Sequence, residues 1–393
     1  MTPARRLLDF LPRFPIVVCV SSNSLYSRTV AVENVIAALE RRCRTSQIFM
    51  SDIPPSELPK LIAVMNKPYP ILTTFSLMTT AYDSVLPETF LGGSAPSLRS
   101  FTLAGSHFPT FPQFILSSTH IVHLSLSRIG YISPEVMASC LATLPKLSSF
   151  RIRSRSPLPH TFQKHTPHLT CAVLPALTRF SFHGFSQYFE ALVSHMDTPI
   201  LKQLSITFFI SALEIPRLHG FVNRIESLGP FGRADMEVSD GKIEMSLGSL
   251  TQFKLAFECE VQDWQLSLMT QVFSQQLRLL SHVEQLEIRE HPWDLDDPVP
   301  DSPLWLELFH LFIAVQSLYV SEKLVATIAA TLKELTVEGA MEVFPALCNL
   351  YLEGNQSSGS VQELINPFIA SRQLSDHPVV IQNWERELSD NDS

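Results

Sequence analysis

Cysteine is scarce in this chain and scattered along it. Six cysteines occur in 393 residues, at positions 19, 43, 140, 171, 259 and 348, and no two form a C-x-x-C pair. Secreted disulfide scaffolds are small and rich in cysteine. The spacing therefore predicts free and mostly buried thiols in an intracellular protein.

A long hydrophobic segment is missing from the N-terminus. Asp9 and Pro12 fall where a signal peptide needs a continuous apolar stretch. The nearby apolar run over residues 15–20 is far shorter than the roughly 20 residues that cross a bilayer. We therefore expect a cytoplasmic or nuclear protein in which the sequon at Asn355 is not glycosylated.

Positive charge is also in deficit. Asp and Glu number 38 against 29 Lys and Arg, which gives a formal net charge of −9. Nucleic acids and anionic membranes attract basic surfaces, so we expect neither as a partner. With only 13 glycines against 28 prolines, the turns are predicted to depend on proline.

Sequence motifs of catalysis are not found. There is no G-x-S-x-G, and the Gly-Lys pair at 241–242 is followed by Ile243, where a P-loop needs Ser or Thr to bind magnesium. We predict no catalytic residue and no cofactor.

Two polar loops contain residues that can bind metal ions. The three histidines of "HTFQKHTPH" would need Cys171 as a fourth zinc ligand. The four aspartates of "DLDDPVPD" do not make an EF-hand, because Val299 and Trp305 replace the required Gly and Glu. We predict solvated loops and no metal site. The residues concerned are His160, His165, His168, Asp294, Asp296, Asp297 and Asp301.

A proline-led repeat runs through the chain. In "FPALCNLYLEGN", residues 344–355, the apolar side chains of Leu347, Leu350 and Leu352 fit neither a pure helical nor a pure strand period. About 0.2 copies of the pattern P-x-L-x-x-[LF]-x-[LIF] are expected by chance. It occurs six times, starting at Pro70, Pro96, Pro145, Pro175, Pro199 and Pro345.

Weaker copies fill the gaps between these six. Where the series is dense, units start about 23 to 30 residues apart, near the period of leucine-rich repeats. The end of each copy predicts a short strand with two inward apolar residues, and the proline sets the entry of the loop. The weaker copies begin at Ile121, Leu250, Val283, Val315 and Leu332.

Amphipathic segments alternate with these strands. Residues 134–144, after the capping Ser133, and residues 187–196 have the apolar stripe of a helix. Helices are also expected near the two ends, over 32–43 and 361–374. Strands alternating with helices at this period predict the α/β class, as an irregular leucine-rich-repeat solenoid with concave parallel strands and outer helices.

Irregularity is expected because the asparagine that usually closes each repeat turn is found only at Asn355. Around Asp240 and Gly241 one unit is replaced by two strands, a plausible hairpin or distorted repeat. We expect an N-terminal segment over 1–15, the solenoid over 16–377, and a C-terminal strand with a disordered acidic tail over 378–393.

Several segments of the sequence resemble a known family of repeat proteins. "FLGGSAPSLRSFTLAG", "GYISPEVMASCLATL" and "DWQLSLMTQVF" resemble the repeat region of the large F-box-like families of mushroom-forming fungi. The resemblance covers about residues 16 to 385. It implies a substrate receptor of a cullin-type ubiquitin ligase or a related interaction protein.

The F-box itself is not seen. "IPPSELPKLI" from Ile53 has the opening of one, but Pro59 interrupts it, and the first tryptophan of the chain is Trp264. Docking to a ligase adaptor is therefore not carried over. We expect a non-catalytic protein-protein interaction scaffold that acts in substrate recognition. The alternatives are an enzyme with an unrecognised composite site and a non-functional remnant of an expanded gene family.

The partner is expected on the concave face of a monomer, at strand residues that alternate with the buried ones. Arg151 and Arg153 suit an acidic segment, and Tyr319 and Tyr351 are aromatic anchors of the kind found at binding hot spots. The protein-binding residues predicted are Arg151, Arg153, His183, Lys254, Glu287, Arg289, Tyr319, Tyr351 and Glu353.

Overall fold

The computed structural model divides into two compact units. The N-terminal unit comprises Met1–Leu201 and Ile215–Ile225, and the C-terminal unit comprises Lys202–Glu214 and Glu226–Ser393. The predicted bounds 1–15, 16–377 and 378–393 remain predictions. The structure describes residues 3–10, 14–21, 30–80, 84–154, 171–209, 215–239, 241–249, 252–259, 262–290, 302–333, 335, 339–353 and 359–384.

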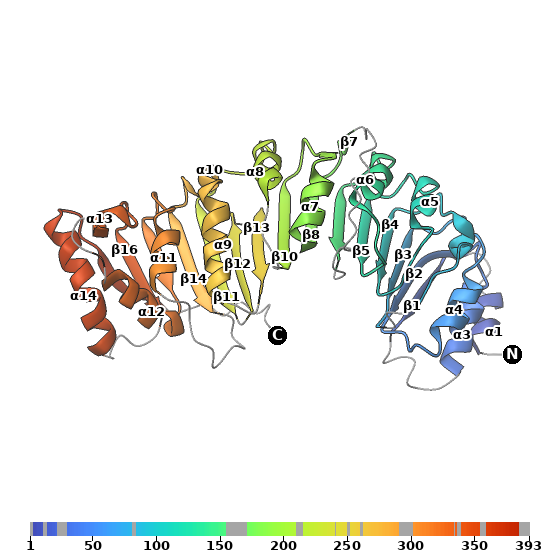
Figure 1. Cartoon of the computed structure of the whole chain (residues 1–393). Coiled ribbons are helices and arrows are strands. Elements are labelled where there is room, and N and C mark those ends of the chain that lie inside the picture. Colours follow the sequence, from blue (N-terminus) through green and yellow to red (C-terminus); the bar gives the residue numbers. More distant parts are fainter. Residues whose placement is uncertain are drawn as a thin grey trace. The chain divides into compact units, whose positions relative to one another are not determined.

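Parallel strands in chain order form the sheet of the N-terminal unit (Figure 1). Each strand is paired with the strand of the next repeat, so equivalent repeat positions lie side by side. The strands are β1 (Ile16–Val20), β2 (Thr45–Ser51), β3 (Thr74–Met78), β4 (Ser100–Ala104), β5 (His123–Ser127), β6 (Ser149–Arg153) and β8 (Arg179–Phe185).

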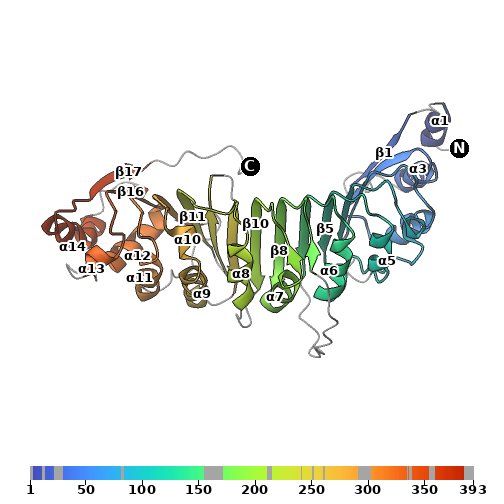
Figure 2. The ribbon, with the colours of Figure 1, turned by 90° about the horizontal axis from the view of Figure 1, so that it is seen from above.

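Helices cover one side of this sheet (Figure 2). The Ser133 hydroxyl caps α6 by accepting a hydrogen bond from the Val136 N–H, as expected for Ser-Pro at a helix start. Two short strands, β7 (Ala172–Val173) and β9 (Met196–Asp197), pair separately. The helices are α1 (Pro3–Phe10), α3 (Val30–Leu39), α4 (Leu58–Val64), η1 (Phe90–Gly93), α5 (Phe111–Leu116), α6 (Pro134–Ala142), α7 (Ser186–Val193) and α8 (Pro216–Asn223).

The repeat core of the N-terminal unit is apolar and rich in phenylalanine. Leu177, Phe180 and Phe182, the three apolar positions of one motif copy, are at most 1% exposed. The Phe180 ring stacks on that of Phe150 in the preceding repeat, with centroids 5.5 Å apart, and on that of Phe189 from α7. The predicted inward register of the motif is therefore confirmed in this repeat.

The turn after β4 shows how a repeat closes without asparagine. Ser106, at the position of the usual asparagine, is buried, and its hydroxyl hydrogen-bonds that of Ser84 at 2.7 Å. Gly105 precedes it with a φ of +82°, and a Cβ there would overlap the carbonyl oxygen of Thr79. Glycine is required at this turn because the neighbouring repeat approaches so closely.

The C-terminal unit contains an inserted antiparallel segment. Its strand order is β10-β13-β12-β11-β14-β15-β16-β17, and β12 runs antiparallel to both of its neighbours. All other pairs in this unit are parallel. The strands are β10 (Gln203–Phe209), β11 (Arg233–Ser239), β12 (Lys242–Leu247), β13 (Phe253–Glu258), β14 (Gln285–Glu290), β15 (Ser317–Val320), β16 (Asn349–Glu353) and β17 (Val380–Trp384).

The hairpin predicted around Asp240 and Gly241 is confirmed by the pairing of β11 with β12, although Asp240 itself lies outside the described residues. The spatial order of the strands is reversed relative to the sequence, because β13 and not β11 pairs with β10. Helices again lie on one side of the sheet (Figure 2). They are α9 (Gln262–Ser274), α10 (Leu277–Leu280), α11 (Ser302–Phe309), α12 (Glu322–Lys333), α13 (Gly339–Glu342) and α14 (Gly359–Leu374).

The loop before β16 is fixed by a buried arginine. Leu347, Leu350 and Leu352 of the opening motif are all buried. Arg372 of α14 is 0% exposed, and its Nη2 donates hydrogen bonds to the carbonyl oxygens of Leu347 at 2.9 Å and Pro345 at 3.2 Å. Burial lowers the pKa of this guanidinium. The proline loop therefore gains hydrogen bonds from the C-terminal helix, whose prediction over 361–374 is confirmed.

The cysteine prediction is right about pairing and wrong about burial. None of the six cysteines forms a disulfide, but only Cys140 is buried, and this burial raises its pKa to about 11. Cys259 is half-buried and the other four are exposed, because Cys19 lies on the outward side of β1 and the rest lie in turns and loops outside the repeat core. None of the described helices is long and apolar enough to cross a membrane.

Replacing Phe180 with Ala tests the core of the N-terminal unit. Truncating a fully buried phenylalanine removes apolar contacts and leaves a cavity, so we expect a loss of about 3–5 kcal/mol in the free energy of unfolding. The matched control is Phe49→Ala, because Phe49 is 38% exposed. Urea denaturation should show a much smaller loss for the control; equal losses would contradict the burial pattern.

Candidate protein-binding surface

The open strand face is defined here as the side of each sheet that the helices do not cover. It is formed by the strand residues that alternate with the buried ones. All nine predicted binding residues occupy such positions in the two units. In the N-terminal unit they are Arg151, Arg153 and His183, and in the C-terminal unit Lys254, Glu287, Arg289, Tyr319, Tyr351 and Glu353.

Two of the predicted basic residues in the N-terminal unit contact each other. Arg153 on β6 lies opposite His183 on β8, and its Nε donates a hydrogen bond to Nδ1 of His183 at 3.1 Å. Arg151 lies opposite Ser181, and its side chain is exposed. Arg155, the third arginine of "RIRSRS", lies outside the described residues.

Arg179 was missed by the sequence reasoning. It lies at the start of β8, opposite Ser149, and is exposed. The motif was interpreted as three strand positions, so the residue before the first inward phenylalanine was not counted. Side chains alternate along a strand, so Arg179 lies on the same face as Ser181, two residues later. Extending the strand by one position would have placed Arg179 on the open strand face.

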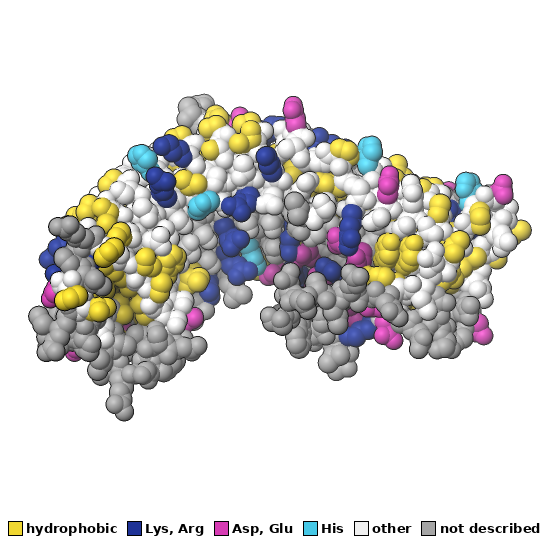
Figure 3. Space-filling view, turned by 180° about the vertical axis from the view of Figure 1, so that it is seen from behind, with side chains coloured by type: hydrophobic (Ala, Val, Ile, Leu, Met, Phe, Trp, Pro, Cys, Tyr) yellow, Lys and Arg dark blue, Asp and Glu magenta, His cyan; other side chains and the backbone are white. Residues whose placement is uncertain are grey.

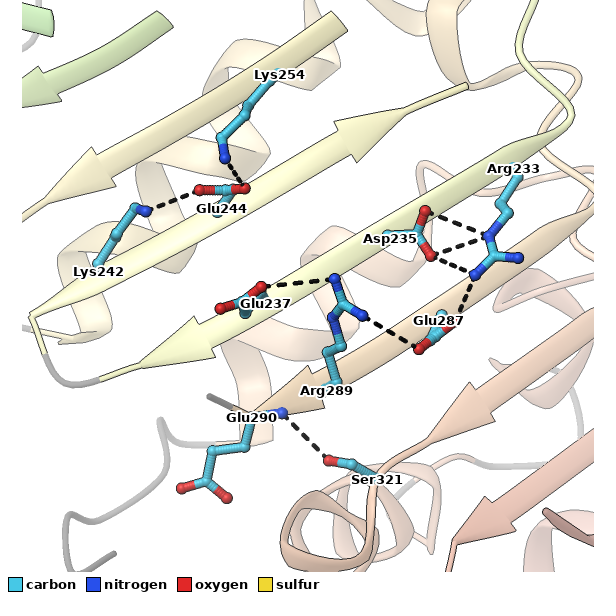
Figure 4. A network of polar contacts seen from close by, with 10 residues as sticks. All are labelled: Arg233, Asp235, Glu237, Lys242, Glu244, Lys254, Glu287, Arg289, Glu290 and Ser321. Atoms are coloured by element: carbon cyan, nitrogen blue, oxygen red, sulfur yellow. Dashed lines mark hydrogen bonds and ion pairs between the residues drawn. The ribbon is translucent and has the colours of Figure 1, made fainter. Parts of the chain in front are cut away.

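Charged residues on strands β11 to β14 of the C-terminal unit form ion pairs (Figure 4). Glu244 on β12 forms ion pairs with Lys254 on β13 and, at 2.8 Å, with Lys242. Lys254, one of the predicted binding residues, belongs to the C-terminal unit, and Glu244 balances its charge. The ion pair between Lys254 and Glu244 could not be predicted from the sequence, because it depends on the inserted strand β12.

A second group of ion pairs surrounds Glu287. Its carboxylate accepts a hydrogen bond from Arg233 at 2.7 Å and lies 3.8 Å from Nη1 of Arg289. Arg233 also pairs with Asp235, and Arg289 with Glu237 at 3.6 Å. Glu287 is only 8% exposed. The predicted binding residues Glu287 and Arg289 therefore also join β14 to β11.

An aromatic cluster lies at the far end of this unit. The rings of Tyr319 and Tyr351 stack with centroids 4.3 Å apart and an interplanar angle of 5°, and Trp384 meets Tyr319 edge-on at 5.4 Å. Burial is the main cause that raises the pKa of Tyr319, and the neighbouring Tyr351 raises it further. Trp384 was missed because β17 lacks the proline-led motif. Glu353, opposite Trp384, accepts a hydrogen bond from the N–H of Glu322.

Metal-binding groups do not gather in the part of the chain that the structure describes. No three His, Cys, Asp or Glu side chains lie close enough there to hold a metal ion. The histidine loop 160–168 and the aspartate loop 294–301 both lie outside the described residues. Their interpretation as solvated loops therefore remains a prediction.

The structure defines a class of protein. Strands paired in parallel, helices on one side and buried L-x-x-L-x-L positions are the features of an α/β leucine-rich-repeat solenoid, here made irregular by the inserted hairpin.

Comparisons with known proteins add little to this assignment of the fold class. No family model matches the chain, and no curated protein matches it. Among solved structures, the chain is similar to the leucine-rich repeat-containing protein LegL7 from Legionella pneumophila, with 11% identity and a TM-score of 0.30 over 86% of this chain and 92% of that one. A similarity this low carries no argument, so the class rests on strand order and repeat core.

Glu244 gives a pH-dependent prediction. Burial alone raises its pKa, but hydrogen bonds from Lys242 and Lys254 outweigh burial and hold the pKa below the ordinary value of 4.5. A lowered carboxyl pKa stabilises the fold above the unfolded pKa, and this stability is lost as the pH falls through the folded pKa. We expect Glu244→Gln to lower the free energy of unfolding by roughly 0.5–1.5 kcal/mol at pH 7.

The difference from the wild type should shrink as the pH falls below 4.5 and disappear in more acidic solution. Glu237→Gln is the control, because Glu237 is more exposed and its ion pair is longer at 3.6 Å. Urea denaturation between pH 3 and 7 measures both variants. A pH-independent loss for Glu244→Gln would show that the ion pairs do not stabilise this hairpin.

Proposed function

We propose that this protein is a non-catalytic scaffold that binds another protein through its open strand face. The observation that carries the proposal is that this face is not covered by the helices, while its side chains lie in register across neighbouring strands. Within each unit, arginine or partly exposed tyrosine side chains lie among polar residues on this face, and such a composition is typical of a protein interface.

The shifted pKa values support a structural role for the ionisable groups. Burial raises the pKa of Tyr69, whose hydroxyl donates a hydrogen bond to the Leu39 carbonyl, and that of Tyr188, which packs on Phe182. Both tyrosines are buried and contribute to the core of the N-terminal unit. Their pKa shifts follow from packing, and the proposal assigns no catalytic role to them.

The cellular context proposed is substrate recognition for a cullin-type ubiquitin ligase. Its support is the resemblance of the repeat phrases to F-box-like proteins of mushroom-forming fungi. The sequence has no recognisable F-box, so we propose no direct contact with a ligase adaptor. Protein partners, and neither nucleic acid nor membrane, fit the net charge of −9.

Affinity purification of the tagged full chain from native cells tests this proposal. The variants reverse charge in the N-terminal unit, Arg151→Glu with Arg153→Glu, and remove the aromatic anchors of the C-terminal unit, Tyr319→Ala with Tyr351→Ala. We expect at least one pair to reduce recovery of specific partners by tenfold or more. Quantitative mass spectrometry measures the recovery, and co-purified cullin-ligase components would support the proposed context.

The control carries Ser139→Glu on α6, which is exposed on the helix side. This variant should recover the same partners as the wild type. Equal loss from the strand-face variants and the control, or no loss from any of them, would place the interface elsewhere. Thermal unfolding of each variant separates a lost interface from a lost fold.

A further inference from the structure

The open strand face of the N-terminal unit has an apolar end. Here the outward positions of β1 to β3 carry Val17, Cys19, Phe49 and Met78, all of them exposed. Phe49 and Met78 are 38% and 45% exposed. Figure 3 shows hydrophobic side chains gathered at this end of the unit. Solvent-exposed apolar side chains on adjacent strands indicate a surface that a partner covers.

The other end of the same face is basic. Its outward positions on β6 and β8 include Arg151, Arg153, Arg179 and His183. Arg151 and Arg179 are exposed and form no ion pair with the described residues. None of the outward positions described on β1 to β6 and β8 is Asp or Glu. This positive charge is therefore not neutralised on the face itself.

Between the two ends, two rows of the face have only short side chains, while the row that leads to Arg179 contains the exposed His123. One row across the strands runs from Phe49 to Arg151, and the next runs from Met78 to Arg153. Such residues leave room for the side chains of a bound segment. Those between the ends are Ser76, Thr102 and Ser125 in the first row, and Ala104 and Ser127 in the second.

The rows set a distance between the two ends. Neighbouring strands lie about 4.8 Å apart, so four steps from Phe49 to Arg151 span roughly 19 Å and three steps from Met78 to Arg153 roughly 14 Å. An extended chain advances about 3.3 Å per residue. A segment that crosses the strands therefore needs about four to six residues to reach from one end to the other.

From this arrangement we infer the kind of partner, an inference that rests on the proposed function. The N-terminal unit binds an extended segment of another protein that carries an apolar side chain about four to six residues from a pair of acidic ones. The apolar side chain covers Phe49 and Met78. The first carboxylate, at this spacing, pairs with Arg151, and the second pairs with Arg179 one strand further on. The segment lies over the short side chains between the apolar end and Arg151.

A nucleic acid fits this surface less well. Its phosphates repeat along the whole strand, but the cations are confined to β6 and β8, and the apolar end offers no charge. In the C-terminal unit the cations of the face are already paired with Glu244, Glu287 and Asp235. The unneutralised positive charge that attracts an acidic segment therefore belongs to the N-terminal unit.

Selection from a random 15-residue peptide library displayed on phage tests the inference, with the full chain as bait. We expect the enriched peptides to share an apolar residue and an acidic pair at the stated spacing. A synthetic peptide of the consensus should bind at least tenfold more weakly to Arg151→Glu with Arg179→Glu, and also to Phe49→Ser with Met78→Ser. Fluorescence anisotropy measures the affinities.

Two further peptides sharpen the test. Shortening the spacing by three residues should weaken binding, and replacing the acidic pair with lysines should restore affinity for the Arg151→Glu and Arg179→Glu bait. Ser139→Glu is the control bait and should bind like the wild type. Thermal unfolding confirms that each bait is folded.

Other outcomes separate this inference from the proposed function. If the enriched peptides depend on Tyr319 and Tyr351 instead, the strand face still binds protein but the inference about the N-terminal unit is wrong. Enrichment of no peptide, of peptides without acidic residues, or equal binding of both spacings would also overturn it. So would binding of a single-stranded RNA of 15 nucleotides that exceeds that of the consensus peptide.

Discussion

The alternation of side chains along a strand is the constraint on which the rest of the structure depends. Because successive residues point to opposite faces, a five-residue strand such as β6 can bury Phe150 and Ile152 only by turning Arg151 and Arg153 to the other side. Parallel pairing in register then repeats this choice from strand to strand. One rule therefore produces both the phenylalanine-rich core and the row of side chains that a partner can contact.

The inserted hairpin shows how this rule survives an irregular repeat. β12 runs antiparallel, yet Met245 still lies opposite Met236 and Leu255, so the buried side remains continuous. Glu244, the neighbour of Met245, must then face outward beside Lys254. Partial burial would destabilise this carboxylate, and the two lysines offset that cost. The ion pairs of this unit follow from the same alternation as its core.

The sequence predicted the repeat core well because each copy is local. Leu177, Phe180 and Phe182 fall within one short motif, so their burial follows from spacing alone. Strand order in the insertion could not be predicted, since pairing of β13 with β10 depends on residues that are far apart in the chain. Exposure of the cysteines was mispredicted because Cys19 lies on an apolar strand whose outward side is open. For the same reason, the exposure of Phe49 and Met78 was not predicted.

The two units differ in what a partner must displace. A ligand that approaches Lys254 or Arg233 meets a cation already paired with a carboxylate, and breaking such a pair costs much of what a new one gives. Arg151 has no ion pair with the described residues, so a carboxylate that approaches it exchanges only hydration. If an acidic segment binds the N-terminal unit as proposed, long-range attraction speeds its association and salt weakens it. The stacked Tyr319 and Tyr351 offer the C-terminal unit an apolar contact that salt does not screen.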